Sequence, residues 1–179
     1  KVTLDNLFGK YSAITRYTVD VKYVASSEML GFSNEQKGKL TVSGNKYILK
    51  FGATETWLGD GKAEYIGTKE EDHSELIIYC PNENFEVPLN YGRLFTFYNE
   101  NVVISSEGGN IKVVPNDNSY KYALLKISNN RLNELTVVDD MDMSYTYTFS
   151  KFIAGSVNVA FTINPKNYAA TIDERAGCK

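Results

Sequence analysis

Large apolar side chains recur at every second position along several segments of this chain, and this period of two restricts its fold more than any other feature. Tyr145, Tyr147 and Phe149 alternate with small polar residues, and segments 17–23 and 47–51 alternate in the same way. Successive side chains of a β-strand point to opposite faces of a sheet, so the spacing predicts strands with aromatic side chains on one face. An ordinary packed core and a ligand cavity share this pattern, and by itself it favours the core.

The composition predicts a folded, β-rich protein. Hydrophobic residues make up 42% of the 179 residues and aromatic residues 13%, with 13 tyrosines. The formal net charge is −3 with dispersed Lys and Arg, which argues against recruitment by nucleic acid or by anionic lipid head groups. The length predicts one domain over residues 1–179. No apolar run approaches the ~20 residues that a membrane-spanning helix needs.

Two helices are expected beside the strands. The first is amphipathic, with Thr3 as its N-cap and an apolar face at helical spacing. That face consists of Leu4, Leu7, Phe8, Tyr11 and Ile14. The second is a short helix that begins near Pro88, because proline is favoured in the first turn of a helix. Its apolar residues include Leu94, Phe95 and Phe97.

Short turns join the predicted strands into a meander. Ser43–Asn45 and Asp60–Gly61 have the residue types of tight hairpin turns. The polar stretch 26–34 is expected to separate two strands. After Gly155 the sequence predicts a closing strand through Phe161 and Ile163, ended by a proline.

Catalytic and metal-binding motifs find little support. His73 is the single histidine and lies in a polar tip, so a zinc site or a Ser-His-Asp arrangement has no partners for it. The acidic run 139–142 fails the EF-hand pattern, because Tyr145 and Lys151 occupy its Gly and Glu positions. Paired catalytic carboxylates have no fixed spacing, and nothing in the sequence selects such a pair. We therefore expect no enzyme, no metal and no cofactor.

The cysteines and the first residue bear on the cellular compartment. Cys80 and Cys178 are the only cysteines, and they form either one disulfide or two independent thiols. The disulfide requires their Cα atoms to lie within about 7 Å. The chain begins at Lys1 without an initiator Met, as a mature form with its targeting segment removed would, and as a cloning boundary also would.

Several motifs in order resemble the periplasmic outer-membrane lipoprotein carrier family (LolA-like), and together they cover most of the chain. The amphipathic helix is followed by a strand at 18–24, and then by Gly38-Lys39-Leu40-Thr41-Val42. Next come the alternating segment 47–51 and the turn Asp60-Gly61-Lys62 with Tyr65. The family's apolar helix is matched at 94–97. The closing segment 161–165 and the coda Asp173-Glu174-Arg175 complete the set.

This resemblance implies a mainly β (α+β) fold. The family has an unclosed, strongly curved antiparallel β-barrel, covered on one side by an N-terminal helix and one or two short helices. It implies a monomeric periplasmic carrier that shields acyl chains and delivers lipoproteins from the inner to the outer membrane. An inner-membrane lipoprotein-releasing transporter would supply the cargo. The rival hypotheses are an envelope sensor of the same fold, which a partner pull-down would identify, and an acyl hydrolase, which turnover of acyl esters would identify.

The resemblance also assigns roles to residues. Leu7, Phe8 and Tyr11 of the first helix and Leu94, Phe95 and Phe97 of the second would form a lid. Enterobacterial members have an arginine for cargo handover after the strand ending here at Val42. This chain has Lys46 as the nearest cation, which lacks the guanidinium fork, so the outer-membrane acceptor is left open. The side chains expected to line the lipid cavity are Tyr17, Val19, Val21, Tyr23, Leu40, Val42, Tyr47, Leu49, Phe51, Trp57, Tyr145, Tyr147 and Phe149.

Overall fold

The described strands form a single twelve-stranded sheet. The computed structural model describes Leu4, Asn6 and Gly9 together with residues 13–81, 102–118, 120–129 and 131–178. The strands are β1 (Arg16–Ser27), β2 (Phe32–Ser43), β3 (Lys46–Phe51), β4 (Glu55–Gly59), β5 (Glu64–Lys69), β6 (Ser74–Tyr79), β7 (Val102–Glu107), β8 (Asn110–Pro115), β9 (Tyr122–Ser128), β10 (Arg131–Val138), β11 (Ser144–Ala154) and β12 (Ala170–Asp173). Two short 3-10 helices, η3 (Pro165–Asn167) and η4 (Arg175–Gly177), flank β12.

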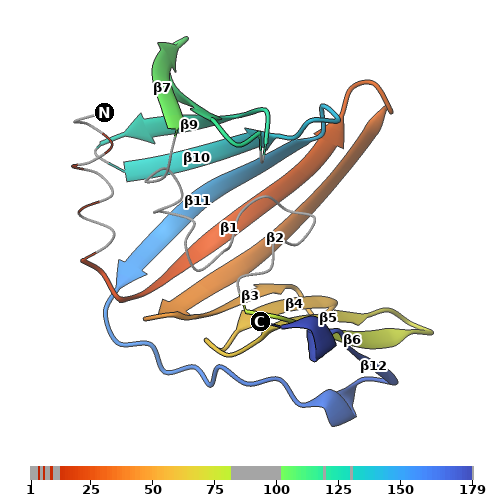
Figure 1. Ribbon diagram of the computed structural model, residues 1–179. Coiled ribbons are helices and arrows are strands. Elements are labelled where there is room, and N and C mark those ends of the chain that lie inside the picture. Colours follow the sequence, from red (N-terminus) through yellow and green to blue (C-terminus); the bar gives the residue numbers. More distant parts are fainter. Residues whose placement is uncertain are drawn as a thin grey trace.

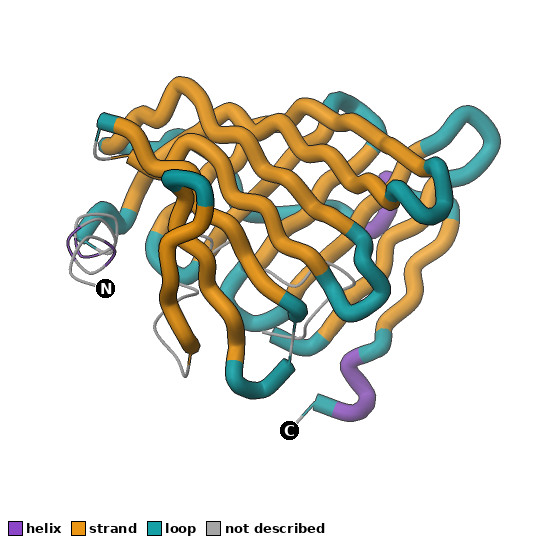
Figure 2. Tube along the Cα trace, turned by 90° about the horizontal axis from the view of Figure 1, so that it is seen from above, coloured by secondary structure: helices purple, strands orange, loops and turns teal. Residues whose placement is uncertain are grey.

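The sheet curves strongly and does not close. Its order is β12-β6-β5-β4-β3-β2-β1-β11-β10-β9-β8-β7, so β12 and β7 form the two edges of the described sheet. Neighbouring strands are antiparallel except β12, which runs parallel to β6. Figures 1 and 2 show the strong curvature of the sheet. The unclosed, curved antiparallel sheet that the resemblance implied is therefore confirmed.

The two faces of the sheet have separate apolar clusters. One face carries Val19, Leu40, Leu49 and Trp57 in cross-strand register, and we call it the inner face because it carries the larger cluster of buried side chains. Its cluster of buried side chains extends over β1–β4 and β8–β11. The outer face has a smaller cluster on β5 and β6, built around Leu76. The strongly buried part of the molecule thus follows the inner face.

The segment between β11 and β12, residues 155–169, is a strap on the outer face, and the closing strand predicted there is wrong. No regular structure is assigned to residues 156–164, although Phe161 and Ile163 are half-buried between exposed neighbours. No strand of the described sheet is paired with these residues. Instead Ile163 and Tyr168 pack on the outer cluster. The alternation therefore reflects packing of an extended chain without a hydrogen-bond ladder.

A close contact fixes the end of the strap. The Tyr168 ring lies directly over Gly67 of β5, where a Cβ atom would overlap its hydroxyl and ring carbons. Lys69 Nζ lies 5.0 Å from the centroid of the same ring. The Ala169 N–H then donates to the Ser74 carbonyl oxygen at 3.1 Å, which starts the parallel pairing of β12 with β6. Only a residue without a side chain at position 67 leaves room for this tyrosine.

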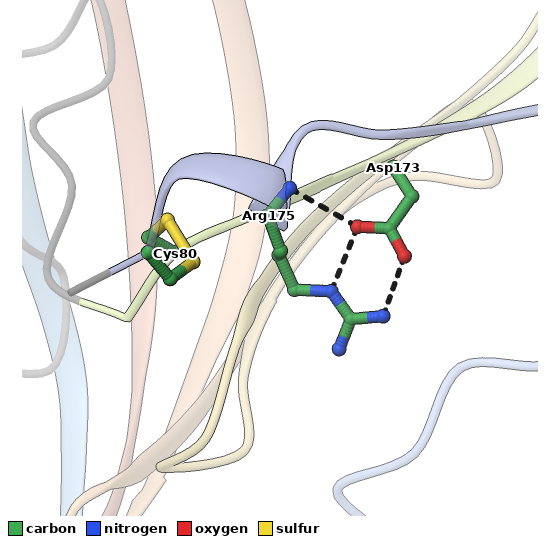
Figure 3. Close-up of a disulfide and its surroundings, with 4 residues drawn as sticks. Cys80, Asp173 and Arg175 are labelled. Carbon is green, nitrogen blue, oxygen red and sulfur yellow. Dashed lines mark hydrogen bonds and ion pairs between the residues drawn. A yellow bond between two sulfur atoms is a disulfide. The ribbon is translucent and has the colours of Figure 1, made fainter.

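The C-terminus is joined covalently to the end of β6. Cys80 and Cys178 form a disulfide with their Cα atoms 5.5 Å apart, so the paired alternative is the one that the structure has (Figure 3). Beside it the Arg175 Nε and Nη2 donate to the two carboxylate oxygens of Asp173 at 2.8 and 2.6 Å. These hydrogen bonds hold the pKa of Asp173 down at about 2. The disulfide therefore attaches the segment after β12 to the end of β6, and the contact between Asp173 and Arg175 stabilises the turn between them locally.

The described residues show little of the predicted helical cover. Leu4, Asn6 and Gly9 are helical, and Leu4 is completely buried in the inner cluster, which agrees with its place on the predicted apolar face. The rest of that helix and the helix predicted from Pro88 lie outside the described residues. The helical cover over one side of the sheet is therefore not confirmed. No helix among the described residues combines the length and apolar character needed to cross a membrane.

Candidate functional site

The inner face brings together every side chain predicted to line a cavity. In the central strands the rows run Tyr17–Val42–Tyr47 and Val19–Leu40–Leu49 across β1, β2 and β3. On the other side of β1, residues Val21, Tyr23 and Ala25 are paired with Phe149, Tyr147 and Tyr145 of β11. Trp57 of β4 is paired with Leu49. Segments that are more than a hundred residues apart in sequence thus contribute to one surface.

The aromatic rings of this surface touch one another across strands. Tyr23 lies at the centre, with its ring centroid 5.9 Å from that of Phe51 and 5.2 Å from that of Tyr147. Tyr17 stacks on Phe152 at 5.0 Å. Tyr23 and Tyr145 are half-buried, whereas the other predicted side chains are buried. Aromatic rings from β1, β3 and β11 therefore contact one another on this face.

The structure adds residues on β8–β10 that the sequence reasoning did not select. Leu135 is paired with Tyr147 on one side and with Leu125 on the other, and all three are fully buried. Val113 and Ala123 continue the surface toward the edge. The sequence pattern that could have selected these residues is weak. Leu124 and Leu125 are adjacent, so the apolar pattern of β9 does not show which face is buried.

Buried polar side chains lie at two places on the inner face. The Tyr47 hydroxyl donates to Glu64 Oε2 at 3.2 Å, and both side chains are almost completely buried. At the opposite end of β4, Glu55 accepts hydrogen bonds from the indole N–H of Trp57 and, at 3.0 Å, from the Gln36 amide. The apolar surface is therefore bordered by carboxylates that already have hydrogen-bond donors.

The turn between β4 and β5 is a compact hydrogen-bonded unit near Lys46, the residue proposed for cargo handover. Asp60 Oδ1 accepts from the backbone N–H groups of Lys62 and Ala63 at 2.7 and 2.9 Å, and Oδ2 accepts from the Tyr65 hydroxyl at 3.0 Å. Burial raises the pKa of Asp60, but these hydrogen bonds outweigh it and leave the pKa below its ordinary value. Lys46 is exposed at the start of β3, and its charge also lowers the pKa of Asp60.

The remaining sequence predictions concern the lid candidates, His73 and the acidic turn at Asp139. The lid candidates Leu7, Phe8, Tyr11, Leu94, Phe95 and Phe97 lie outside the described residues, so the lid stays a prediction. His73 is in the exposed tip between β5 and β6, as predicted. Asp139 supports a turn, as predicted, by accepting from Met141 and Met143 N–H groups at 3.0 and 2.8 Å. No cluster of metal-binding side chains occurs among the residues that the structure describes.

Comparisons with known proteins identify the fold. The sequence matches no protein-family model and no curated protein. Among solved structures, an uncharacterized conserved protein from Thermus thermophilus matches with a TM-score of 0.55 at 11% identity, over 96% of this chain and 97% of that one. A LolA superfamily protein from Nitrosomonas europaea matches with a TM-score of 0.45 at 11% identity, over 88% and 96%. The lipoprotein LppX from Mycobacterium tuberculosis has a TM-score of 0.44 at 12% identity, over 89% and 97%.

The Thermus protein shares the fold of this chain along almost the full length of both. That fold is an open, strongly curved antiparallel sheet. The resemblance of the sequence motifs implied such a sheet, whereas the helical cover that it also implied is not confirmed. An open, strongly curved sheet of this kind is therefore the part of the resemblance that the comparison supports.

Proposed function

We propose that this protein binds the acyl chains of a lipid or lipoprotein against the inner face of its sheet. The observation that carries this proposal is the continuity of that face. Apolar side chains from β1–β4 and β8–β11 form one contiguous surface, with aromatic rings at its centre. An acyl chain transferred from water to such a surface gains about 0.8 kcal/mol for each buried methylene group. A long flexible chain would match a long apolar surface better than a compact ligand would.

The tyrosines suit a carrier that must also release its cargo. A tyrosine ring offers apolar area, and its hydroxyl finds a polar partner, so the surface need not be rearranged completely when the acyl chain leaves. Tyr47 shows this arrangement in its hydrogen bond to Glu64. Acyl chains could then be bound tightly enough for shielding and still be transferred to an acceptor.

The motifs that resemble the lipoprotein carrier family support a more specific role. In this role the protein is a monomeric, non-enzymatic carrier in the periplasm. It would receive acylated cargo from an inner-membrane transporter and deliver it to the outer membrane. The disulfide is compatible with an oxidising compartment. Lys46 is the candidate for contact with the acceptor, because it is exposed at the start of β3.

The single tryptophan allows a direct test. Trp57 lies on the inner face, so a fatty acid brominated along its chain should quench Trp57 fluorescence when it binds there. A brominated short-chain acid at the same concentration should not. Mass spectrometry of lipids extracted from the purified protein would identify the natural acyl ligand.

A pair of variants tests the location. Tyr23→Asp places a charge at the centre of the aromatic surface, and it should weaken quenching at least tenfold because an unpaired charge is costly in an apolar site. Val103→Asp is the matched control, since Val103 of β7 is 57% exposed. Melting temperatures would show that both variants are folded. Equal quenching of folded wild-type and Tyr23→Asp protein, or none in either, would contradict the proposed function.

A further inference from the structure

Strands β10 and β11 separate at one end and leave a wedge in the sheet. Their pairing runs from Val138 opposite Ser144 to Glu134 opposite Thr148, and no pair is formed beyond that point. Both strands nevertheless continue, β10 back to Arg131 and β11 onward to Ala154. The wedge is therefore an interruption of the hydrogen-bond ladder inside the sheet and does not lie at its edge.

An irregularity in each strand accompanies the separation. The register between β9 and β10 shifts between Leu132 and Glu134, which leaves Asn133 as the extra residue. The register between β1 and β11 shifts at Thr18 and Asp20, opposite Lys151, whose φ is +51°. A side-chain-bearing residue seldom adopts a positive φ, and such bulges are often found where a side chain is redirected toward a functional site. The two irregularities face each other across the wedge.

A cavity of about 200 Å³ fills this wedge. Its apolar lining is Leu132, Phe149 and Phe152, of which the first two are buried members of the inner cluster and the third packs against that cluster. The cavity therefore continues the aromatic inner face through the sheet. It is smaller than the roughly 300–1,000 Å³ of typical ligand pockets, so it suits one chemical group of a larger ligand.

The rest of the lining is polar and positively charged. Arg131 and Lys151 contribute the cations, and Asn133 and Ser150 the uncharged polar groups. Lys151 Nζ lies 3.2 Å from Asp20 Oδ2, and Lys39 Nζ lies 3.8 Å from the other oxygen of the same carboxylate. Two lysines thus share one carboxylate, while Arg131 is in no ion pair within the described part of the chain. An anion would balance this local charge, although the whole chain is acidic.

We propose that the wedge between β10 and β11 binds the anionic head group of an acyl ligand whose chain lies on the inner face. The inference rests on the proposed function and narrows its ligands to acyl compounds with a carboxylate or phosphate at one end. Arg131 and Lys151 bind the anion, and Leu132, Phe149 and Phe152 contact the first carbons of the chain. Head group and chain are thus bound on a single continuous surface.

The test compares two brominated probes that differ only in the charge of the head group, a fatty acid and its methyl ester. Quenching of Trp57 is measured for both, below their micelle-forming concentrations. Wild-type protein should bind the acid about tenfold more tightly than the ester, and added salt should reduce this preference. Arg131→Gln/Lys151→Asn should abolish the preference and leave the affinity for the ester unchanged. Asparagine is chosen at position 151 because it tolerates a positive φ. Lys166→Gln, which removes an exposed cation outside the wedge, is the control and should keep the preference.

Four results would bear on the head-group site and on the proposed function. Equal binding of acid and ester by wild-type protein, or a preference that survives in the double variant, would overturn the head-group site and leave acyl binding intact. Failure of both probes to bind wild-type protein would contradict the proposed function and the head-group site together. Displacement of the acid by millimolar inorganic phosphate would show a free-anion site and overturn the link to acyl chains. If the double variant does not fold, Arg131→Gln alone, at an exposed position, must lower the acid preference.

Discussion

Tyr47 reaches Glu64 across an intervening strand. The two residues lie on β3 and β5, and Gly59 of β4 is paired with both of them. A Cβ atom at Gly59 would overlap the Tyr47 ring, so the ring passes over the glycine to bring its hydroxyl 3.2 Å from Glu64 Oε2. This row of three residues combines a close approach of backbone and ring with a buried hydrogen bond to a carboxylate.

We expect Tyr47→Phe to lower the free energy of unfolding by about 1–3 kcal/mol, because a hydrogen bond between two buried side chains is lost. Urea unfolding would measure this loss. A double-mutant cycle with Glu64→Gln should give a coupling energy of about 1 kcal/mol between the two side chains. Additive effects of the two substitutions would contradict a direct interaction.

Gly59→Ala should destabilise the protein by about 1–3 kcal/mol, because the added methyl group displaces a buried ring. Gly177→Ala is the matched control, since a Cβ there meets no atom within 4 Å. If the clash with Tyr47 is the cause, Gly59→Ala should cost much less in a Tyr47→Ala background. The same cost in both backgrounds would assign the effect to the backbone instead.

Removal of the disulfide should lower the stability by about 2–4 kcal/mol, because the bond closes a long loop in the unfolded chain. The bridged residues are 98 positions apart. For a chain of this length the loss corresponds to a fall in melting temperature of roughly 5–15 °C. Calorimetry of Cys80→Ala/Cys178→Ala protein would measure it. The wild-type protein should also melt at a lower temperature when reductant is added. The disulfide would not stabilise the fold if the variant and the reduced wild-type protein both melted at the temperature of the oxidised wild type.

Acid should weaken the local contact between Asp173 and Arg175 at the end of β12. The pKa of Asp173 is about 2, lowered by its hydrogen bonds from the Arg175 side chain and backbone. A carboxylate whose pKa is lowered on folding contributes stability above its unfolded pKa of about 3.9, and the contribution is lost as the pH falls toward 2. Asp173→Asn should therefore melt below the wild type above pH 4, and the difference should vanish near pH 2. A difference that is constant from pH 5 to pH 2 would contradict this assignment.

The local pattern of the sequence predicted most of the inner face, because the period of two depends only on the backbone of each strand. Tyr145, Tyr147 and Phe149 share a face for that reason. The partner of their strand was beyond such reasoning, since the pairing of Val21 with Phe149 joins segments far apart in the chain. The stretch 26–34 was expected to separate two strands, and only residues 28–31 lie between β1 and β2, because both strands extend into it. Its polar residues include Asn34, which is paired with Ala25 at the far end of the β1–β2 hairpin.

Contacts between distant segments of the chain explain why the remaining features were not predicted from the sequence. The alternation of Phe161 and Ile163 is that of a strand, but Ile163 packs on the outer cluster and no pairing with a described strand is formed. The wedge was invisible because Asn133 and Lys151 are ordinary polar residues, and nothing local indicates that they occupy bulges. Gly67 and Gly59 belong to strands in which glycine is usually unfavourable. The ring over Gly59 comes from another strand, and the ring over Gly67 comes from the strap.

The strand order has a consequence for the course of folding. Strands β1–β6 form a block whose two borders are completed only by β11 and β12, the last strands of the chain. Until those residues are available, the block has unpaired backbone groups along both β1 and β6. Such open edges favour pairing with other chains, and sheets that depend on distant pairings fold slowly. A polypeptide that stops before residue 144 would therefore have most of the aromatic surface but neither border, and we expect it to aggregate.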